Sequence, residues 1–354
     1  TFSGNARPIP QVRISIPEYT LVPGTKGWLA FKAHLAYGMF TDDHWQQDFI
    51  QSSNLKHTKH VLYHSKDLYV RIGNREKFPI LFEGGLEMAT QFGGQSITGD
   101  KVINMPNGIK DFFKVLIPSS GGSDTPIGEQ TNIYGNHLGS WNFSLTWFAP
   151  DNWVVRPYYE HYFEDHSQMF GEYGWKDGLV GVELTIPKNP FISSFVYEFL
   201  GTKDQSGPIN WDHKPLIPEQ VSGLDDYYNH DIYTGWQHWG QAIGNPLIMS
   251  PIYNADGSIQ FKSNRVKAHH FGIMGQPHSD WKYRLLISFS RNWGTYKVPF
   301  YEIVKNGNAM LEVTYQPHQW AGWEFSLAGA VDRGELLGRS TGGMLTIKKR
   351  GIIK

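Results

Sequence analysis

Aromatic and polar side chains alternate between residues 201 and 264 in a pattern that suits sugar binding. Sugars present apolar C–H faces that stack on aromatic rings, and hydroxyl groups that hydrogen-bond to carboxylates and amides. The alternative is that these rings pack the segment against the rest of the protein and bind nothing. Six residues are the candidate glycan-binding set: Trp211, Tyr227, Tyr228, Trp236, Trp239 and Asp226.

Ionisable residues at alternate positions form a second candidate group. Two carboxylates that face each other can hydrolyse a glycosidic bond. Alternatively, charges on one face of a strand pair with one another across a wet interior, where each satisfies its neighbour. We favour this second interpretation and expect a lumenal ladder of charges that comprises Lys32, Glu83, Glu87, Arg156, Glu160 and Glu164.

Motifs for other chemistry are absent from the sequence. It has no glycine-rich phosphate loop, no His-Glu-x-x-His motif and no cysteine, which excludes disulfides and cysteine nucleophiles. The neighbours His57, His60 and His64 are interpreted as solvated side chains rather than metal ligands. A serine nucleophile on a strand needs a histidine two residues away, and His-x-Ser does not occur. We therefore expect no catalytic residue, no metal and no cofactor.

The overall composition narrows the class of protein further. The chain has 354 residues and a formal net charge of -1, which gives no electrostatic reason to expect a nucleic-acid partner. Charged residues make up 18% and aromatic residues 15%, which argues against a disordered chain, a coiled coil or a collagen-like rod. No run of 18 apolar residues predicts a transmembrane helix.

The elements that would position these side chains are β-strands, because apolar residues recur at every second position. In 28–40, Leu29 and Phe31 share an apolar face opposite Lys32 and His34. The best helical pattern is short and covers 107–116. Strands are predicted at 9–17, 28–40, 60–72, 81–92, 139–148, 153–164, 179–187, 190–200, 265–274, 281–290, 309–315, 322–332 and 342–350.

Such alternation fits both a soluble β-sandwich and a transmembrane β-barrel, which differ in the face that meets water. Clustered charges on the polar faces favour the barrel, and so do long connections at 41–59, 93–137 and 201–264 among short ones. A third feature is a set of aromatic residues near strand ends, where an interfacial girdle would lie: Trp28, Phe40, Trp141, Trp147, Trp153, Phe163, Trp281 and Trp323.

We therefore predict an all-β fold, an antiparallel transmembrane β-barrel of about 14–18 strands. It forms a single domain, 1–354, in which 201–264 is a long loop at the mouth or in the lumen. Bacterial single-chain barrels have even strand numbers. Thirteen predicted strands therefore lead us to expect further N-terminal sequence that is absent here.

Four segments resemble the capsule-assembly Wzi family, in particular its branch in anaerobic gut-type Gram-negative bacteria. The resemblance implies an outer-membrane β-barrel, eighteen-stranded in the family's characterised member, that attaches and organises capsular polysaccharide without catalytic residues. It also implies a longer chain that is exported through a cleaved signal peptide. In the family's order, the segments are LYHSKDLYVRIG (62–73), FEGGLEMATQFGG (82–94), GNHLGSW (135–141) and DDYYNHDIYTGWQHWGQAIGNPLIMSP (225–251).

Three hypotheses for function follow from the residues and the resemblance. The first is a non-catalytic outer-membrane protein that binds or organises capsular or other surface polysaccharide. Its partners would be this glycan, outer-membrane lipid and lipopolysaccharide, with no nucleic acid. The alternatives are an outer-membrane pore, which requires an open lumen, and a structural subunit of a larger envelope protein complex.

Overall fold

One antiparallel sheet of 13 strands dominates the computed structural model. The structure describes residues 2–126, 133–164, 166–170, 176–207, 210–211, 221–222 and 225–351. Each strand pairs with the next strand of the sheet along the chain. In order these are β1 (Gln11–Leu21), β2 (Leu29–Met39), β4 (Leu62–Ile72), β5 (Ile80–Phe92), β8 (Asn136–Phe148), β9 (Val154–Phe163), β10 (Gly178–Thr185), β11 (Ser194–Gly201), β16 (Val266–His278), β17 (Trp281–Gly294), β18 (Pro299–Tyr315), β19 (Trp323–Gly334) and β20 (Arg339–Lys349).

The all-β fold and all thirteen predicted strands are confirmed. The largest difference lies in β18, which begins ten residues before the predicted start at 309. Its middle contains Asn306-Gly307-Asn308, residues that are typical of turns. The strand continues through them because every residue from Asn306 to Tyr315 pairs with β19. One continuous sheet also differs from a sandwich, which has two sheets packed face to face.

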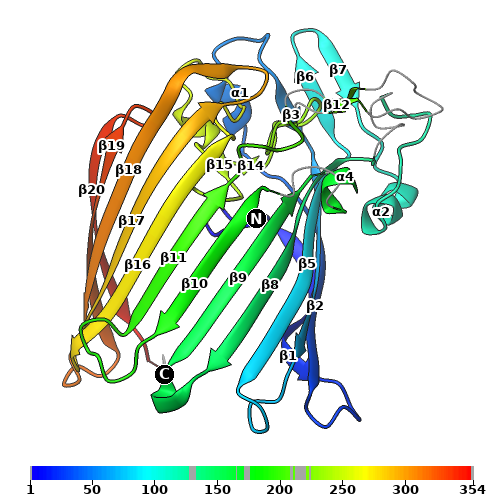
Figure 1. Ribbon diagram of the computed structural model, residues 1–354. Coiled ribbons are helices and arrows are strands. Elements are labelled where there is room, and N and C mark those ends of the chain that lie inside the picture. Colours follow the sequence, from blue (N-terminus) through cyan, green and yellow to red (C-terminus); the bar gives the residue numbers. More distant parts are fainter. Residues whose placement is uncertain are drawn as a thin grey trace.

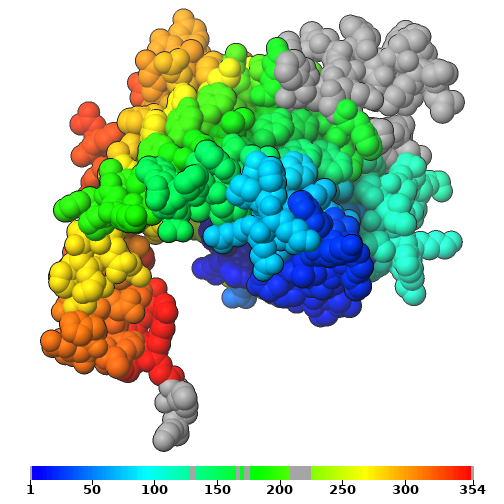
Figure 2. All heavy atoms as spheres, turned by 60° about the horizontal axis from the view of Figure 1, so that its bottom comes forward, coloured from blue at the N-terminus to red at the C-terminus, as the bar shows by residue number. Residues whose placement is uncertain are grey.

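The sheet is strongly curved, and in the described part of the chain it is open between β1 and β20 (Figure 1). Figure 2 shows empty space between these two edges, with β1 in blue and β20 in red. Neighbouring strands are antiparallel and the sheet has 13 of them, so its first and last strands run in the same direction.

The two faces of the sheet have opposite character. The concave face carries polar and charged residues such as Lys32, His34 and Glu87, whereas the convex face exposes apolar ones. On β19, for example, Leu327 on the convex face is 64% exposed, while the neighbouring Ser326 is buried. The exposed convex residues include Val12, Ile14, Leu68, Phe82, Leu145, Val180, Phe289, Leu311, Leu327, Leu345 and Ile347.

Long and short connections lie at opposite ends of the strands. All four long connections, 40–61, 93–135, 164–177 and 202–265, leave the same end, which we name the long-loop end. The opposite, short-turn end carries connections of two to eight residues. The connections contain α1 (Trp45–Phe49), β3 (His57–Lys59), β6 (Gln95–Thr98), β7 (Lys101–Asn104), α2 (Ile109–Leu116), η1 (Pro150–Asn152), α4 (His166–Met169), β12 (Asn210–Trp211), β13 (Val221–Ser222), β14 (Gln237–His238), β15 (Gln241–Ala242) and η2 (Pro251–Tyr253).

The predicted helix at 107–116 corresponds to α2 and is confirmed. Among the described residues, no helix combines the length and the apolar character needed to cross a bilayer.

Candidate functional site

Residues 225–264, named the plug from here on, fill the concave side of the sheet at its long-loop end. The largest hydrophobic cluster of the described residues lies between the plug and the ends of the strands. It joins Tyr228, Trp236 and Phe261 of the plug to side chains such as Leu138 and Leu200 of the wall. The strands therefore form a curved wall, and the plug packed against it supplies much of the hydrophobic core.

Buried and half-buried polar side chains hold the plug in one conformation. The Asn229 amide nitrogen donates to Asp226 Oδ1 at 2.9 Å and to the Phe261 carbonyl at 2.8 Å, and its oxygen accepts from Phe261 N–H at 2.8 Å. Asn264 Nδ2 also donates to Asp226 Oδ1 and to the Tyr227 carbonyl. Burial raises the pKa of Asp226, although these donors oppose the shift. Its carboxylate is therefore already occupied inside the plug.

Three of the predicted glycan-binding rings are buried. Tyr227, Tyr228 and Trp236 have at most 3% of their surface exposed, so none presents a free face on which a sugar could stack. For these rings the structure matches the packing alternative, because the plug needs its own apolar interior. Trp211 lies in β12, and its side chain is outside the described part of the chain.

Trp239 differs from the other predicted rings, because it is only partly buried. It occupies the tip of the β14–β15 hairpin with Gly240, at φ angles of 54° and 75°. Two positive φ angles define a type I′ turn, in which Asn-Gly is the preferred pair. A bulky residue with positive φ costs on the order of 1–3 kcal/mol. The indole packs under the guanidinium of Arg7, 4.0 Å from the ring centroid.

The predicted charge ladder lies largely on the concave wall, but its members pair with other residues. Arg156 bonds Glu183 at 2.7 Å rather than Glu160, because the register places Glu183 directly opposite Arg156. Glu164 lies beyond the end of β9, and its carboxylate accepts the Tyr228 backbone N–H at 2.6 Å. Glu164 therefore anchors the plug through Tyr228 and does not extend a ladder of charges along the wall.

Three other ladder residues, Lys32, Glu83 and Glu87, lie beside tyrosine or serine side chains. The Lys32 ammonium lies 4.5 Å from the centroid of the Tyr69 ring, and Tyr69 donates to Glu87 at 3.4 Å. Glu83 accepts a hydrogen bond from Ser144 at 3.1 Å. These three charges are thus satisfied across the strands of a polar wall. Glu160, the sixth predicted member, lies on β9 between Asn142 of β8 and Leu179 of β10. Within the described ranges, no group of three or more His, Asp and Glu side chains is arranged to hold a metal ion.

A Ser–His–Asp series of hydrogen bonds lies on the same wall and was not predicted from the sequence. His34 Nδ1 lies 2.5 Å from Asp67 Oδ2, and His34 Nε2 lies 3.0 Å from Ser65 Oγ. This is the order of a hydrolase relay. The sequence pattern considered above places serine and histidine on one strand, whereas here β2 supplies His34 and β4 supplies Ser65 and Asp67. The pairing of His34 with Asp67 across these strands is the signal that would have revealed it.

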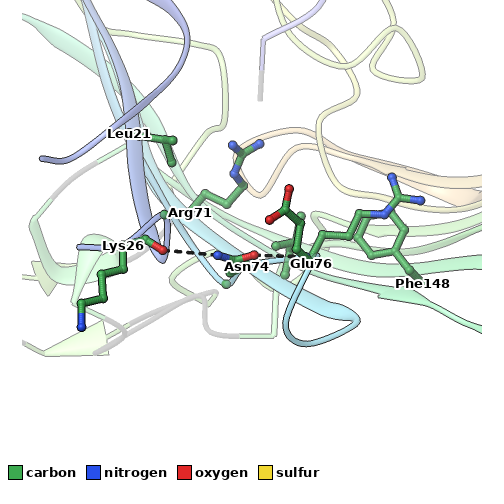
Figure 3. Close-up of a pocket in the computed structure, with 10 residues that line it drawn as sticks. Leu21, Lys26, Arg71, Asn74, Glu76 and Phe148 are labelled. Atoms are coloured by element: carbon green, nitrogen blue, oxygen red, sulfur yellow. Dashed lines mark hydrogen bonds between the residues drawn. The ribbon is translucent and has the colours of Figure 1, made fainter. Parts of the chain in front are cut away.

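A pocket of about 700 Å³ opens at the short-turn end, far along the strands from the plug (Figure 3). It lies between the turns that connect β1 to β2 and β4 to β5, where Asn74 Nδ2 donates to the Lys26 carbonyl at 3.3 Å. The Arg75 guanidinium packs on Phe148, 4.1 Å from the ring centroid. Lys26, Arg71 and Arg75 make the lining mainly cationic, with one carboxylate from Glu76.

His230 forms a pH-sensitive contact in the plug. Its Nδ1 accepts the backbone N–H groups of Ile232 at 3.1 Å and Tyr233 at 3.4 Å, so this nitrogen carries no proton. Burial lowers the pKa of His230 to about 4. Lys56 donates to the carbonyls of His230 and Asp231, and burial lowers its pKa to about 8.

Acidification should loosen the plug through His230. Because its folded-state pKa lies below the ordinary value near 6.5, its contribution to stability is complete above pH 6.5 and is lost as the pH falls toward 4. Hydrogen exchange of plug amides should therefore accelerate between pH 6.5 and 4, after correction for the intrinsic pH dependence of exchange.

The matched control for this prediction is His230→Asn, which keeps an acceptor and does not titrate. Asp177 acts in the opposite direction, because burial raises its pKa to about 6. The difference between wild type and His230→Asn isolates the histidine. Equal acid sensitivity in both proteins would contradict the assignment.

Comparison with known proteins adds no family to this picture. No family model matches the sequence, and a search of curated proteins also finds no match. The fold and the site themselves define the class: an all-β protein in which one curved antiparallel sheet, polar inside and apolar outside, holds an ordered plug on its concave face.

Proposed function

We propose that this chain forms the wall and plug of an outer-membrane β-barrel that binds surface polysaccharide without catalysis. The observation that carries the proposal is the reversed polarity of the sheet, apolar on the convex face and polar on the concave face. Monomeric soluble proteins rarely expose contiguous apolar patches above a few hundred Å². Lipid around the convex face would satisfy these residues, and water within the lumen would solvate the polar wall.

Aromatic residues at the short-turn end support the same location. Five of the eight predicted girdle residues lie there with exposed side chains: Trp28, Trp147, Trp153, Trp281 and Trp323. Tryptophan prefers the boundary between hydrocarbon and water, and outer-membrane barrels place short turns on the periplasmic side. In this proposal the long-loop end and the plug face the cell surface.

Closure of the barrel sets a condition on strand number. Because β1 and β20 run in the same direction, an odd number of additional strands must lie between them in a fully antiparallel ring. The 13 strands would then become an even number, as in bacterial single-chain barrels. These strands could belong to the same polypeptide or to another chain.

The resemblance of four segments to the Wzi family and the position of Trp239 support polysaccharide as the ligand. The most extensive of these segments, 225–251, forms most of the plug. A filled mouth favours a binding platform over an open pore. Among the predicted rings whose side chains the structure describes, Trp239 is only partly buried, and its positive φ is an unfavourable backbone conformation for a bulky residue.

Removal of the Trp239 ring should weaken glycan binding about tenfold, the loss of about 1.4 kcal/mol that one stacked ring supplies. The variant Trp239→Asn keeps a favourable turn residue, so the plug should remain folded. The measurement is retention of the source bacterium's own surface polysaccharide by purified protein in detergent.

Trp320→Asn is the matched control, because it removes an exposed indole from the short-turn end. It should leave retention unchanged. Two results would reject the proposed site. One is no retention of these glycans by the wild-type protein, and the other is equal retention by wild type and Trp239→Asn.

A hydrolase is the second candidate, favoured by the Ser65–His34–Asp67 hydrogen-bond order. Ser65 is only 4% exposed, which opposes attack on a substrate, and we interpret the chain as a cross-strand polar contact. Labelling with a fluorophosphonate separates the two functions. A label on wild type that disappears in Ser65→Ala would select the hydrolase.

A further inference from the structure

We propose that α2 is an interfacial helix that inserts three apolar side chains into the lipid leaflet at the long-loop end. The inference rests on the proposed membrane location of the convex face and extends it to a specific lipid contact. The helix belongs to the connection between β5 and β8 and lies outside the wall (Figure 1).

Two side chains of the convex face fasten the helix to the wall. Tyr37 Oη donates to the Phe112 carbonyl at 2.9 Å, and Lys66 Nζ donates to the carbonyls of Val115 at 3.0 Å and Leu116 at 2.5 Å. The Val115 and Leu116 carbonyls lie at the C-terminal end of the helix, which favours a cation such as the Lys66 ammonium. The helix is therefore held in a defined orientation on the outside of the barrel.

The inner side of the helix is well packed. Val115 is fully buried, and the Phe112 ring meets Phe92 edge to face, with 5.1 Å between the ring centroids. At the N-terminus, Asp111 accepts the Gly108 backbone N–H at 2.9 Å. These contacts leave the opposite side of the helix as its free face.

Three large apolar side chains line this free face. Ile109, Phe113 and Ile117 recur at intervals of four residues and are 79%, 66% and 73% exposed. Ile109 and Phe113 lie one turn apart on the same side of α2, and Ile117 follows the last helical residue as its C-cap in extended conformation. These three exposed side chains are named the stripe from here on.

Along the strand direction, the stripe lies level with the end of the apolar convex surface that is nearer the long-loop end. Lys66, which fixes the C-terminal end of α2, is followed toward the short-turn end by Leu68 and Ile72, both exposed on the same convex face. The stripe thus continues the apolar band of the wall at the point where polar residues begin. An amphipathic helix in this position lies in the boundary between headgroups and acyl chains.

Size and charge favour lipid over a protein partner. A stable protein interface buries about 800 Å² per partner, much more than two side chains of an eight-residue helix and one at its C-cap offer. Lys110 is exposed beside the stripe and can place its ammonium at the level of lipid phosphates. We therefore assign the stripe to a phosphate-bearing acyl lipid of the membrane.

The 354-residue sequence contains no cysteine, so single cysteines can be introduced for a direct test. Single cysteines are introduced by Phe113→Cys, Lys110→Cys and Leu68→Cys, and each is labelled with an environment-sensitive fluorophore. All three side chains are accessible, so the substitutions should leave the fold intact. The full-length proteins are reconstituted in vesicles of phosphatidylethanolamine and phosphatidylglycerol, and quenching by a lipid-borne nitroxide is compared with quenching by aqueous iodide.

The label at position 113 should be quenched severalfold more by the lipid-borne nitroxide than the label at position 110. Iodide should show the reverse order. Position 68 reports on the wall itself: lipid quenching at 68 together with aqueous quenching at 113 would overturn the interfacial helix and leave the barrel intact. Aqueous quenching at 68 would overturn the membrane location. Shielding of 113 from both quenchers would indicate a protein partner and reject the lipid assignment.

Discussion

Replacement of Leu327 by arginine should destabilise the membrane-inserted protein by about 2–4 kcal/mol, the range for a cation at the bilayer midplane of a β-barrel. Leu327 lies near the middle of β19 on the convex face and is 64% exposed. A soluble protein would tolerate the change, because an exposed arginine remains hydrated. The test is the urea midpoint of folding into lipid vesicles.

Ala330→Arg provides the matched control, three residues along the same strand on the concave face. Its cross-strand partners are Met310 and Gly342, and the space around Gly342 is open, so a long side chain can extend over the glycine into the lumen. This variant should fold like wild type. Equal stability of Leu327→Arg and Ala330→Arg in vesicles would contradict the lipid-facing assignment.

Trp236→Ala should open the plug and cost about 3–5 kcal/mol of stability, the usual range for removal of a large buried aromatic side chain. The ring is fully buried and meets Phe2 edge to face, with 6.1 Å between centroids. Loss of the ring leaves a cavity between the plug and the wall. In planar bilayers, the variant should conduct ions where wild type does not, and its melting temperature should fall.

Trp236→Phe is the control for this prediction. It retains most of the ring volume, and the lost indole N–H has no partner among the described residues. Its conductance should resemble that of wild type. If wild type already conducts as strongly as Trp236→Ala, the plug does not close the lumen, and the pore hypothesis gains support.

The strands could be predicted because their signal is local. A residue at every second position reports which face it occupies, and both faces of this sheet are chemically uniform over most of its width. The beginning of β18 was missed because Asn306 and Gly307 usually mark turns, and only pairing with β19 keeps them extended. Tertiary contacts decided that segment, and a single sequence does not contain them directly.

The site was less predictable, because the same residue types serve packing and binding. Tyr228, Trp236 and Trp239 carry similar sequence signals, yet the first two are buried and the third sits at a hairpin tip. Exposure depends on how the plug folds against the wall. The contact between His34 and Ser65 likewise requires the register of two strands.

The two open edges of the sheet have a consequence for the timing of assembly. Backbone N–H and C=O groups on the outer sides of β1 and β20 have no ladder partner in the described sheet, and each such group costs several kcal/mol in hydrocarbon. Neither edge can therefore enter the bilayer core alone. A free edge also invites pairing with other chains. In the proposed outer-membrane location, both edges must therefore be paired before the sheet enters the bilayer core, so closure at β1 and β20 would precede or accompany membrane insertion.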